Sequence, residues 1–491
     1  MKKFLLLILC LTTAWTLSAQ QVNWGAPIKL KEKIFAPNTV SAGKYLGTIN
    51  GTDYYAEYSN HAGFLKFDDA VFSFYQTKGN SVIKVSDLTT LKYNVLDAAI
   101  IEDQIAVIHI KGTKNEKRQI KIDFYNPNTF RKGETMNVFS FQPLNKDPYI
   151  NFVKSDNQQF NCIVMNGKHP DTGKGTLIIK CFDSKYNEVW THYYDFDGSG
   201  YPEIGDMIVS NSGDLVIHFF VYESDKKKSL RSFDFVEFNS SASEQVSYRL
   251  PSSKVEVVDY KMDQYGSEHQ YLFVYTEEEK VTGVKVDFNS DNVGEIFTNK
   301  PYKGFWKVDK ILDLENGNYT VALQNRNMTE ITVRQSNGFT STTYYWWNRS
   351  FQFIGLNSET DEIMYKKMVG RKYSVILPYY TPEPHISVPP FYFAKNGELN
   401  VIYNTDKKTD ESESNAKEKP VIFAGFAKST TKPLTKMITI SETGRTTVKT
   451  LFDEKTTKLT FLSKFSHINE NDELIVAVGK KKKFMVGKMK L

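Results

Sequence analysis

The segment Asn211-Ser-Gly-Asp-Leu-Val-Ile-His-Phe-Phe220 is a polar turn followed at once by an apolar run. Asn and Gly favour tight turns, and a short apolar run bounded by a turn is typical of a buried β-strand. The same order of residues recurs along the chain, which indicates a repeat fold. The other copies lie at 50–56, 102–110, 156–164, 266–274, 316–323, 396–403 and 471–478.

Further strands flank each copy. Several copies are preceded by a short apolar stretch, as at 207–210, and many are followed by a charged turn and a third predicted strand, as at 179–183. A fourth run then follows, as at 188–194. Four successive antiparallel strands, repeated, are typical of β-propeller blades, and helical periodicity is nearly absent. The sequence therefore predicts an all-β propeller.

The two ends of the chain predict how the ring closes. The last unit supplies three strands, at 462–467, 474–478 and 484–491, and a lone strand candidate lies at 28–34. We expect this N-terminal strand to join the C-terminal blade, because that would remove two exposed sheet edges. The sequence predicts seven or eight four-stranded antiparallel blades, with the least regular stretch at 34–93. A string of β-sandwiches and an irregular two-domain β protein are the competing interpretations.

This pattern resembles secreted bacterial β-propeller proteins of uncharacterised function. The resemblance covers the chain after its first 19 residues and depends on periodicity and on turns such as Asn396-Gly-Glu-Leu399. The Trp-Asp endings of WD40 blades and the paired glycines of kelch repeats are missing.

The first 19 residues have the order of a secretory signal peptide. Lys2 and Lys3 precede an apolar run at 4–17, and Ala19 offers a small residue for cleavage. The run is shorter than the ~20 apolar residues that a membrane span needs. The sequence predicts cleavage near Ala19, a single β-propeller domain over 20–491, and no later transmembrane segment. It predicts a secreted, periplasmic or cell-surface location.

The charge distribution constrains the partners. The formal net charge is +5, which is close to balanced for 491 residues and argues against nucleic acid as a partner. We expect a protein or glycan partner outside the cytoplasm. Charged clusters at 114–118, 225–228, 277–280 and 480–483 all fall between a second and a third strand, so solvated hairpin tips on one face would explain them. The segment 407–419 is nearly devoid of apolar residues, which predicts a mobile loop insertion.

An aromatic run at 344–351 is the most unusual local feature. In an extended strand Trp346 and Trp347 point to opposite faces, so they cannot both lie in the core. One interpretation is that an exposed ring stacks on a sugar or peptide. The other is that the two rings shield an enlarged blade. Tyr379, Tyr380 and His385 lie in a nearby Pro-rich loop and are the next candidates for a ligand-binding surface.

Two other groups of residues suggest a metal ion and a covalent bond. Asp195 and Asp197 precede a Gly-Ser-Gly turn, which fits either a calcium site or an ordinary turn between blades; no other cofactor is predicted. Cys162 and Cys181 lie on two predicted strands of one hairpin and come nearly opposite each other. A cross-strand disulfide and two buried free thiols are both open interpretations.

Catalytic motifs are missing from the sequence. No HExxH or GxSxG is present, and the histidines are scattered. His109 and His218 occupy what we interpret as equivalent positions late in the second strand, which suggests packing residues. The sequence favours an exported binding or scaffolding propeller. The alternatives are a polysaccharide- or peptide-acting hydrolase or lyase with carboxylates in the central depression, and one part of a larger exported machine.

Overall fold

A computed structural model describes most of the chain. The described residues are 22–29, 40–63, 66–79, 81–91, 94–112, 117–144, 149–195, 201–223, 229–252, 255–301, 306–334, 340–377, 389–406, 433–453, 459–480 and 483–491. The predicted signal peptide and the predicted loop at 407–419 lie outside these residues.

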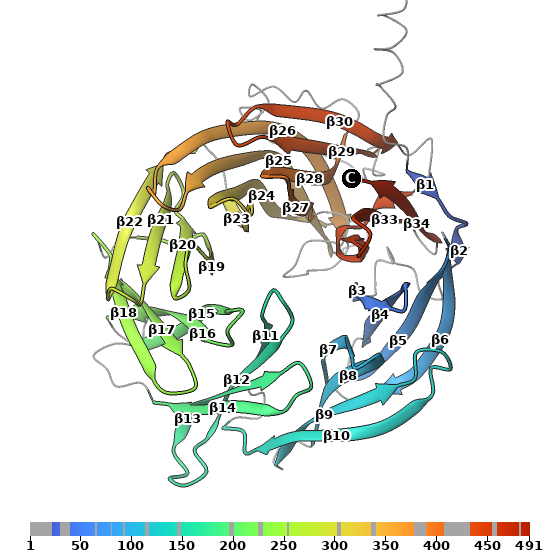
Figure 1. Cartoon of the computed structure of the whole chain (residues 1–491), viewed down its shortest axis with the longest axis horizontal. Helices are drawn as coiled ribbons and strands as arrows, with labels where there is room; N and C mark the ends of the chain where they lie inside the picture. Colours follow the sequence, from blue (N-terminus) through green and yellow to red (C-terminus); the bar gives the residue numbers. More distant parts are fainter. Residues whose placement is uncertain are drawn as a thin grey trace, which may run out of the picture.

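The described strands form an eight-bladed β-propeller. Figure 1 shows the sheets arranged radially around one axis. Seven of the described sheets have their strands in sequence order from one sheet edge to the other, and the eighth combines strands from both ends of the chain. We number the blades 1 to 8 along the chain and call the strands of each blade A to D from the axis outward. The prediction of an all-β propeller with seven or eight blades is confirmed, and the number is eight.

The first four blades contain consecutive strands of the chain. Blade 1 contains β3 (Val40–Ile49), β4 (Thr52–Gly63), β5 (Lys66–Lys78) and β6 (Ser81–Leu91); blade 2 contains β7 (Asn94–Ile101), β8 (Gln104–Lys111), β9 (Arg118–Tyr125) and β10 (Lys132–Phe141); blade 3 contains β11 (Ile150–Lys154), β12 (Phe160–Lys168), β13 (Gly175–Asp183) and β14 (Glu188–Tyr194); blade 4 contains β15 (Tyr201–Val209), β16 (Leu215–Tyr222), β17 (Leu230–Phe238) and β18 (Ser243–Arg249).

The next three blades follow the same order. Blade 5 contains β19 (Asp259–Gln264), β20 (Gln270–Thr276), β21 (Val281–Asp287) and β22 (Asn292–Asn299); blade 6 contains β23 (Trp306–Asp313), β24 (Asn318–Arg334), β25 (Thr340–Asn357) and β26 (Ile363–Leu377); blade 7 contains β27 (Phe391–Lys395), β28 (Glu398–Asp406), β29 (Pro433–Ile440) and β30 (Thr446–Asp453).

Blade 8 joins the two ends of the chain. β33 (Glu473–Lys480) and β34 (Lys483–Lys490) form its centre, and the short strands β1 (Asn23–Trp24) and β2 (Ile28–Lys29) both pair with β34. Figure 1 shows these blue N-terminal strands beside red β34. The predicted ring closure is therefore confirmed, although its described strands are short and begin earlier than the expected stretch at 28–34.

The inner strand of blade 8 differs from the prediction. We expected one strand at 462–467, but β31 (Thr460–Phe461) and β32 (His467–Ile468) are separated by a 3₁₀ turn at Ser463–Phe465. The Ser466 hydroxyl accepts a hydrogen bond from the Ala477 amide at 2.9 Å. In a continuous inner strand, a backbone carbonyl would accept this hydrogen bond. This turn directs Leu462 and Phe465 into the core against blade 1.

The hydrophobic core is divided among the interfaces between blades. One cluster contains Phe233 and Phe235 of blade 4 and Phe273 and Val284 of blade 5, and the other clusters likewise combine neighbouring sheets. Central strands are buried on both faces, which explains their nearly continuous apolar sequences. Each blade thus buries its faces only against its two neighbours.

Antiparallel pairing gives the propeller two different faces. The turns between strands A and B and between strands C and D all emerge at one end of the strands, which we call the AB/CD face. The turns between strands B and C emerge at the opposite end, which we call the BC face. The predicted charged tips lie on the BC face where they are described, as at 277–280.

The strands of blade 6 extend beyond the blade. β24, β25 and β26 have 17, 18 and 15 residues, compared with 8, 9 and 7 residues in β16, β17 and β18 of blade 4. The extra residues of β24 and β25 form a hairpin that continues past the BC end of the sheet, and its register runs without a gap from Asn327 to Arg334. The described part of the chain contains no helix with the length and apolarity of a membrane span.

Candidate functional site

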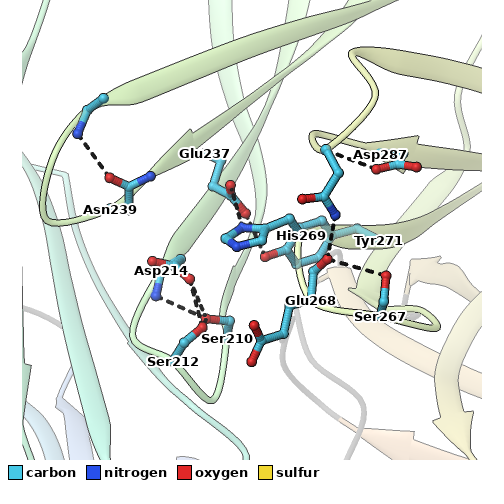
Figure 2. A network of polar contacts seen from close by, with 12 residues as sticks. Ser210, Ser212, Asp214, Glu237, Asn239, Ser267, Glu268, His269, Tyr271 and Asp287 are labelled. Carbon is cyan, nitrogen blue, oxygen red and sulfur yellow. Dashed lines mark hydrogen bonds and ion pairs between the residues drawn. The ribbon is translucent and has the colours of Figure 1, made fainter.

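A cluster of polar side chains lies at the junction of blades 4 and 5 on the AB/CD face (Figure 2). The Glu237 carboxylate on β17 is 2.8 Å from Nδ1 of His269 and accepts a hydrogen bond of 3.0 Å from the Tyr271 hydroxyl. Glu237 has only 2% of its side chain exposed, whereas His269 has 33%. A buried carboxylate thus holds a half-exposed imidazole at the molecular surface.

The turn that carries His269 is fixed on several sides. His269 has a φ of +63°, in the left-handed region that side chains seldom adopt, and its carbonyl accepts a 3.1 Å hydrogen bond from the Phe288 amide. Asn289 donates to the Glu268 carbonyl at 2.9 Å, and Gln270 donates to Asp287 at 2.9 Å. The AB turn of blade 5 is therefore locked onto the CD turn of the same blade, which sets the position of the imidazole.

The environment shifts the pKa values of both partners. Burial lowers the pKa of His269, but the charge of Glu237 and the hydrogen bond to it outweigh burial, so the net pKa is raised. Burial raises the pKa of Glu237 and outweighs the opposing effect of His269. The nearby Asp214 adds to the increase in both cases. The pair consequently retains a proton to higher pH than either group would alone.

Asp214 belongs to a second small network beside this pair. Its carboxylate accepts a 2.7 Å hydrogen bond from the Ser212 hydroxyl, and its amide donates to the Ser210 hydroxyl at 3.0 Å. Figure 2 shows these residues on the AB turn of blade 4, facing the Glu237–His269 pair. The site therefore combines two acidic groups and several hydroxyls around one imidazole.

This arrangement can bind and exchange protons. With Glu237 accepting from Nδ1, the Nε2 atom of His269 has no hydrogen-bond partner among the described residues and is left for a ligand or water. No Ser, Thr or Cys side chain in the described ranges hydrogen-bonds to this imidazole. The hydrogen-bonded nucleophile and base that covalent catalysis requires are therefore not found among the described residues of this site. The geometry suits recognition of a polar or charged ligand.

Carboxylate side chains also lie along the innermost strands, and most of them contact a residue of a neighbouring blade. Asp206 of β15 accepts a 2.8 Å hydrogen bond from the Met262 amide of β19, and Asp259 accepts one of 2.8 Å from the Val308 amide of β23. Further contacts of this kind include Asp97 with Lys154 at 2.8 Å and Asp309 with the Tyr392 hydroxyl. These acidic groups lie near the axis, but their contacts hold blades together.

Asp263 of β19 is different, because its ionisation is strongly disfavoured. Burial raises its pKa to about 6, and the nearest cation, Lys310, is 3.8 Å away. Among the described inner-strand carboxylates, it has the clearest potential to act as an acid near neutral pH.

The predicted aromatic site is only partly visible. Trp346 and Trp347 both lie on β25 in the extended part of blade 6, opposite Met328 and Asn327 respectively. The Trp347 indole N–H donates to the Thr329 hydroxyl at 3.2 Å, and the Arg349 guanidinium stacks on its ring at 4.8 Å. The side chain of Trp346 is not described. The stacking of a ligand on these rings stays a prediction.

Most of the other predicted residues lie in parts of the chain that the structure does not describe. Tyr379, Tyr380 and His385 lie outside the described residues, as does Asp197, and Asp195 is exposed at the end of the described blade 3. No group of three or more His, Cys, Asp or Glu side chains in the described ranges could hold a metal ion. The calcium site and the loop surface therefore stay predictions.

The equivalence of His109 and His218 is wrong. His109 shares a face of β8 with Ile105 and Val107, which pack toward blade 1. His218 shares a face of β16 with Val216 and Phe220, which pack toward blade 5. Their alignment in the repeat is off by one residue, and in a strand that difference exchanges one face for the other.

Comparisons with known proteins concern only the fold. No protein-family model matches the chain, and no curated protein sequence matches it. Similar solved structures include the WD40 domain of SCAP from fission yeast, with 10% identity, 96% coverage of both chains and a TM-score of 0.37. The Dos1 propeller has 8% identity, 95% coverage of both chains and a TM-score of 0.39. An oligogalacturonate lyase in complex with manganese has 6% identity, 96% coverage of both and a TM-score of 0.35.

Proposed function

We propose that this protein is an exported β-propeller that binds a basic protein partner on its AB/CD face. One observation carries the proposal: the turns of this face expose many acidic side chains and few basic ones. The acidic residues that are exposed there and have no ion pair among the described residues are Asp103, Asp156, Glu268, Asp291, Glu315, Glu359, Glu362, Glu442 and Glu470.

Basic side chains do not balance this charge. The lysines and arginines in the same described turns are Arg131, Lys185 and Arg445, and Lys185 already pairs with Glu102 at 2.6 Å. A face with an excess of one sign of charge attracts a partner of the opposite sign and accelerates its association. The attraction between exposed charges weakens at high ionic strength, so binding should depend steeply on salt.

The Glu237–His269 pair lies within this acidic face. A protonated His269 opposes the approach of a positive group, whereas the neutral imidazole can accept a hydrogen bond from it. Binding of a basic partner should therefore weaken as the pH falls through the raised pKa of His269. Such a pH dependence, measured on partner binding, would distinguish recognition at the blade 4–5 junction from recognition at a distant part of the surface.

Charge reversal tests the proposal. The double variant Glu268→Lys with Glu315→Lys places two positive charges on the AB/CD face, and Glu278→Lys with Glu279→Lys makes the same change on the BC face. Each protein is used to capture partners from the native cell envelope at low and high salt. We expect the first variant to lose a defined basic partner by on the order of tenfold, and the second to retain it. Equal losses in both variants would contradict binding on the AB/CD face.

Export is the second part of the proposal. It is supported by the basic, apolar and small residues at 1–19. Sequencing the N-terminus of the protein from its native source should give a chain that begins near residue 20, recovered outside the cytoplasm. An intact Met1 in a cytoplasmic fraction would contradict it.

Asp263 favours one alternative, a hydrolase or lyase acting on polysaccharide or peptide. A carboxylic acid with a pKa of about 6 near the axis could serve as a general acid. The test is turnover of a panel of glycans and peptides by the protein and by its Asp263→Asn variant. Turnover that the variant abolishes would replace the binding proposal with an enzymatic one.

A further inference from the structure

The two central strands of blade 3 place the only two described cysteines side by side. Cys162 on β12 and Cys181 on β13 are direct partners in the antiparallel register. Both side chains are completely buried, and both are free thiols in the structure. They belong to the cluster that packs blade 3 against blade 4, together with Val164, Leu215 and other apolar residues.

Their backbone positions suit a covalent link. Directly opposed residues of antiparallel strands have Cα atoms about 4.5–5.5 Å apart, and a disulfide spans Cα separations of about 4.4–6.8 Å. The bond would therefore form with small side-chain rotations and would leave the strand pairing unchanged. It would close the loop from 162 to 181, which contains the turn between β12 and β13.

The surroundings also tolerate loss of the thiol protons. The Cys181 sulfur is 3.4 Å from the carbonyl oxygen of Gly213 in blade 4, to which the thiol can donate. The same carbonyl accepts a 3.2 Å hydrogen bond from the indole N–H of Trp190. Oxidation of Cys181 thus leaves no buried acceptor without a donor, and the energetic penalty of an unsatisfied carbonyl does not arise.

We propose that Cys162 and Cys181 form a cross-strand disulfide in the exported protein, and that the bond forms before blade 4 packs against blade 3. The inference rests on the proposed export, because thiols are oxidised stably outside the reducing cytoplasm. The disulfide would link the two central strands of blade 3 covalently.

The chemistry balances as a thiol–disulfide exchange. One cysteine thiolate attacks a sulfur of a small-molecule or enzyme disulfide, and a mixed disulfide and one free thiol result. The second cysteine thiolate then displaces the remaining half of the oxidant. Each cysteine loses one proton, the oxidant takes up two electrons, and it leaves as two thiols.

The timing follows from burial. In the folded protein both sulfurs lie beneath blade 4, where no external disulfide reaches them. Burial also raises the pKa of the Cys162 thiol well above its usual range, and the adjacent Cys181 thiol raises it further, so the attacking thiolate is suppressed. Exchange is therefore confined to the folding chain, and the completed bond is protected from reductants.

Refolding tests the bond independently of export. The full chain is denatured, reduced, refolded with a mixture of reduced and oxidised glutathione, and then alkylated in denaturant. Peptide mapping separates Cys162 and Cys181 from Cys10. We expect a linked peptide whose mass is about 2 Da below that of the dithiol pair. Alkylation of both cysteines in the folded fraction would overturn the proposal, whatever the outcome for export.

Two controls sharpen the result. In each of the single variants Cys162→Ser and Cys181→Ser, the remaining cysteine of the pair should be alkylated. We do not expect it to form a disulfide with Cys10 instead. The oxidised, folded protein should also keep its link in native buffer with dithiothreitol and lose it only when denaturant is added. Rapid reduction in native buffer would contradict a bond that is sealed by blade 4.

Discussion

The imidazole of His218 is completely buried at the interface of blades 4 and 5. Its Nδ1 atom is 3.4 Å from the Asp206 amide, and a Cβ atom on Gly205 would come within 2.2 Å of it, so the packing is tight. Burial lowers its pKa to about 3. Aromatic rings surround it, namely those of Phe220, Phe233, Phe235, Tyr260 and Phe273.

This lowered pKa predicts acid lability. The unfolded chain binds a proton at His218 below pH 6.5, whereas the folded chain does so only near pH 3. Stability should therefore fall by about 1.4 kcal/mol per pH unit between these values on account of this residue. The variant His218→Asn should be less stable at neutral pH but should lose this slope. Denaturant midpoints at several pH values measure it, and the control His169→Asn, on the β12–β13 turn, should retain the slope.

The Glu237–His269 pair makes the opposite prediction. The pKa of His269 is raised, so its contribution to stability is complete below pH 6.5 and is lost as the pH rises through the folded value. Glu237→Gln removes the carboxylate, and the pKa of His269 should then fall below that of the unmodified protein. Proton NMR titration of the ring measures this shift. Glu268→Gln changes an exposed neighbour and should have a much smaller effect; an unchanged titration in Glu237→Gln would contradict the pairing.

The sequence could not have predicted this pair. Glu237 and His269 are separated by 32 residues and belong to different blades, so the contact depends on how two sheets face each other. His269 was only one of several scattered histidines. The sequence around His269 gives only a weak indication of a site. Its Gly-Ser-Glu-His turn differs from the Asn-Gly turns elsewhere, but nothing in it indicates which residue would contact the histidine. The misalignment of His109 and His218 has the same origin, since period-2 patterns fix a face only when the register is known.

At the scale of elements, the long strands of blade 6 are attached to blade 7 by a buried arginine. The Arg371 guanidinium on β26 donates to the Asn404 carbonyl of β28 at 2.9 Å, and it lies over the rings of Phe351, Tyr373 and Tyr403. Only 1% of its surface is exposed, and burial lowers its pKa to about 10. A planar cation stacks on these rings, whereas a compact ammonium group cannot.

Substitution of Arg371 should separate charge from shape. Arg371→Lys keeps a positive charge in a buried site but loses the stacking, and we expect a loss of about 2 kcal/mol in the free energy of unfolding. Arg371→Met fills a similar volume without a charge and should cost less. Denaturant unfolding of both variants decides the order. A methionine variant that is less stable than the lysine variant would show that the charge itself stabilises the junction.

Most elements were predictable because the local pattern and the packing agree. The turn-and-strand copies correspond to the B strands of the blades, and the predicted fourth strand at 188–194 coincides with β14. The inner strand of blade 8 was not predictable, because the Ser466 hydroxyl replaces a backbone partner and permits a 3₁₀ turn within an apolar run. The aromatic run at 344–351 suggests an enlarged blade as one of two interpretations, but it does not predict how long the blade 6 strands are, since it gives composition and no boundaries.

At the scale of the whole molecule, the ring is held closed by a small set of contacts on β34. Trp24 pairs with Gly487, where a Cβ atom would come within 2.6 Å of the Trp24 ring, so glycine makes room for the indole. The ring also meets Phe452 of blade 7 edge-on at 5.0 Å. Ile28 packs against a cluster shared by blades 8 and 1. The N-terminal segment therefore touches both neighbours of the closing blade.

Trp24→Ala should weaken closure more than its position near a chain end suggests. Loss of this half-buried ring should lower the free energy of unfolding by about 2 kcal/mol, because a cavity opens between blade 7 and the closing blade. Release of the short strands would also expose the edge of β34, and an unpaired edge promotes association between chains. Thermal unfolding and light scattering measure the two effects. The matched variant Trp347→Ala removes an indole from the blade 6 extension, which no other blade needs for closure, and should change neither quantity as much. Equal effects of the two substitutions would mean that the ring does not depend on its N-terminal strand.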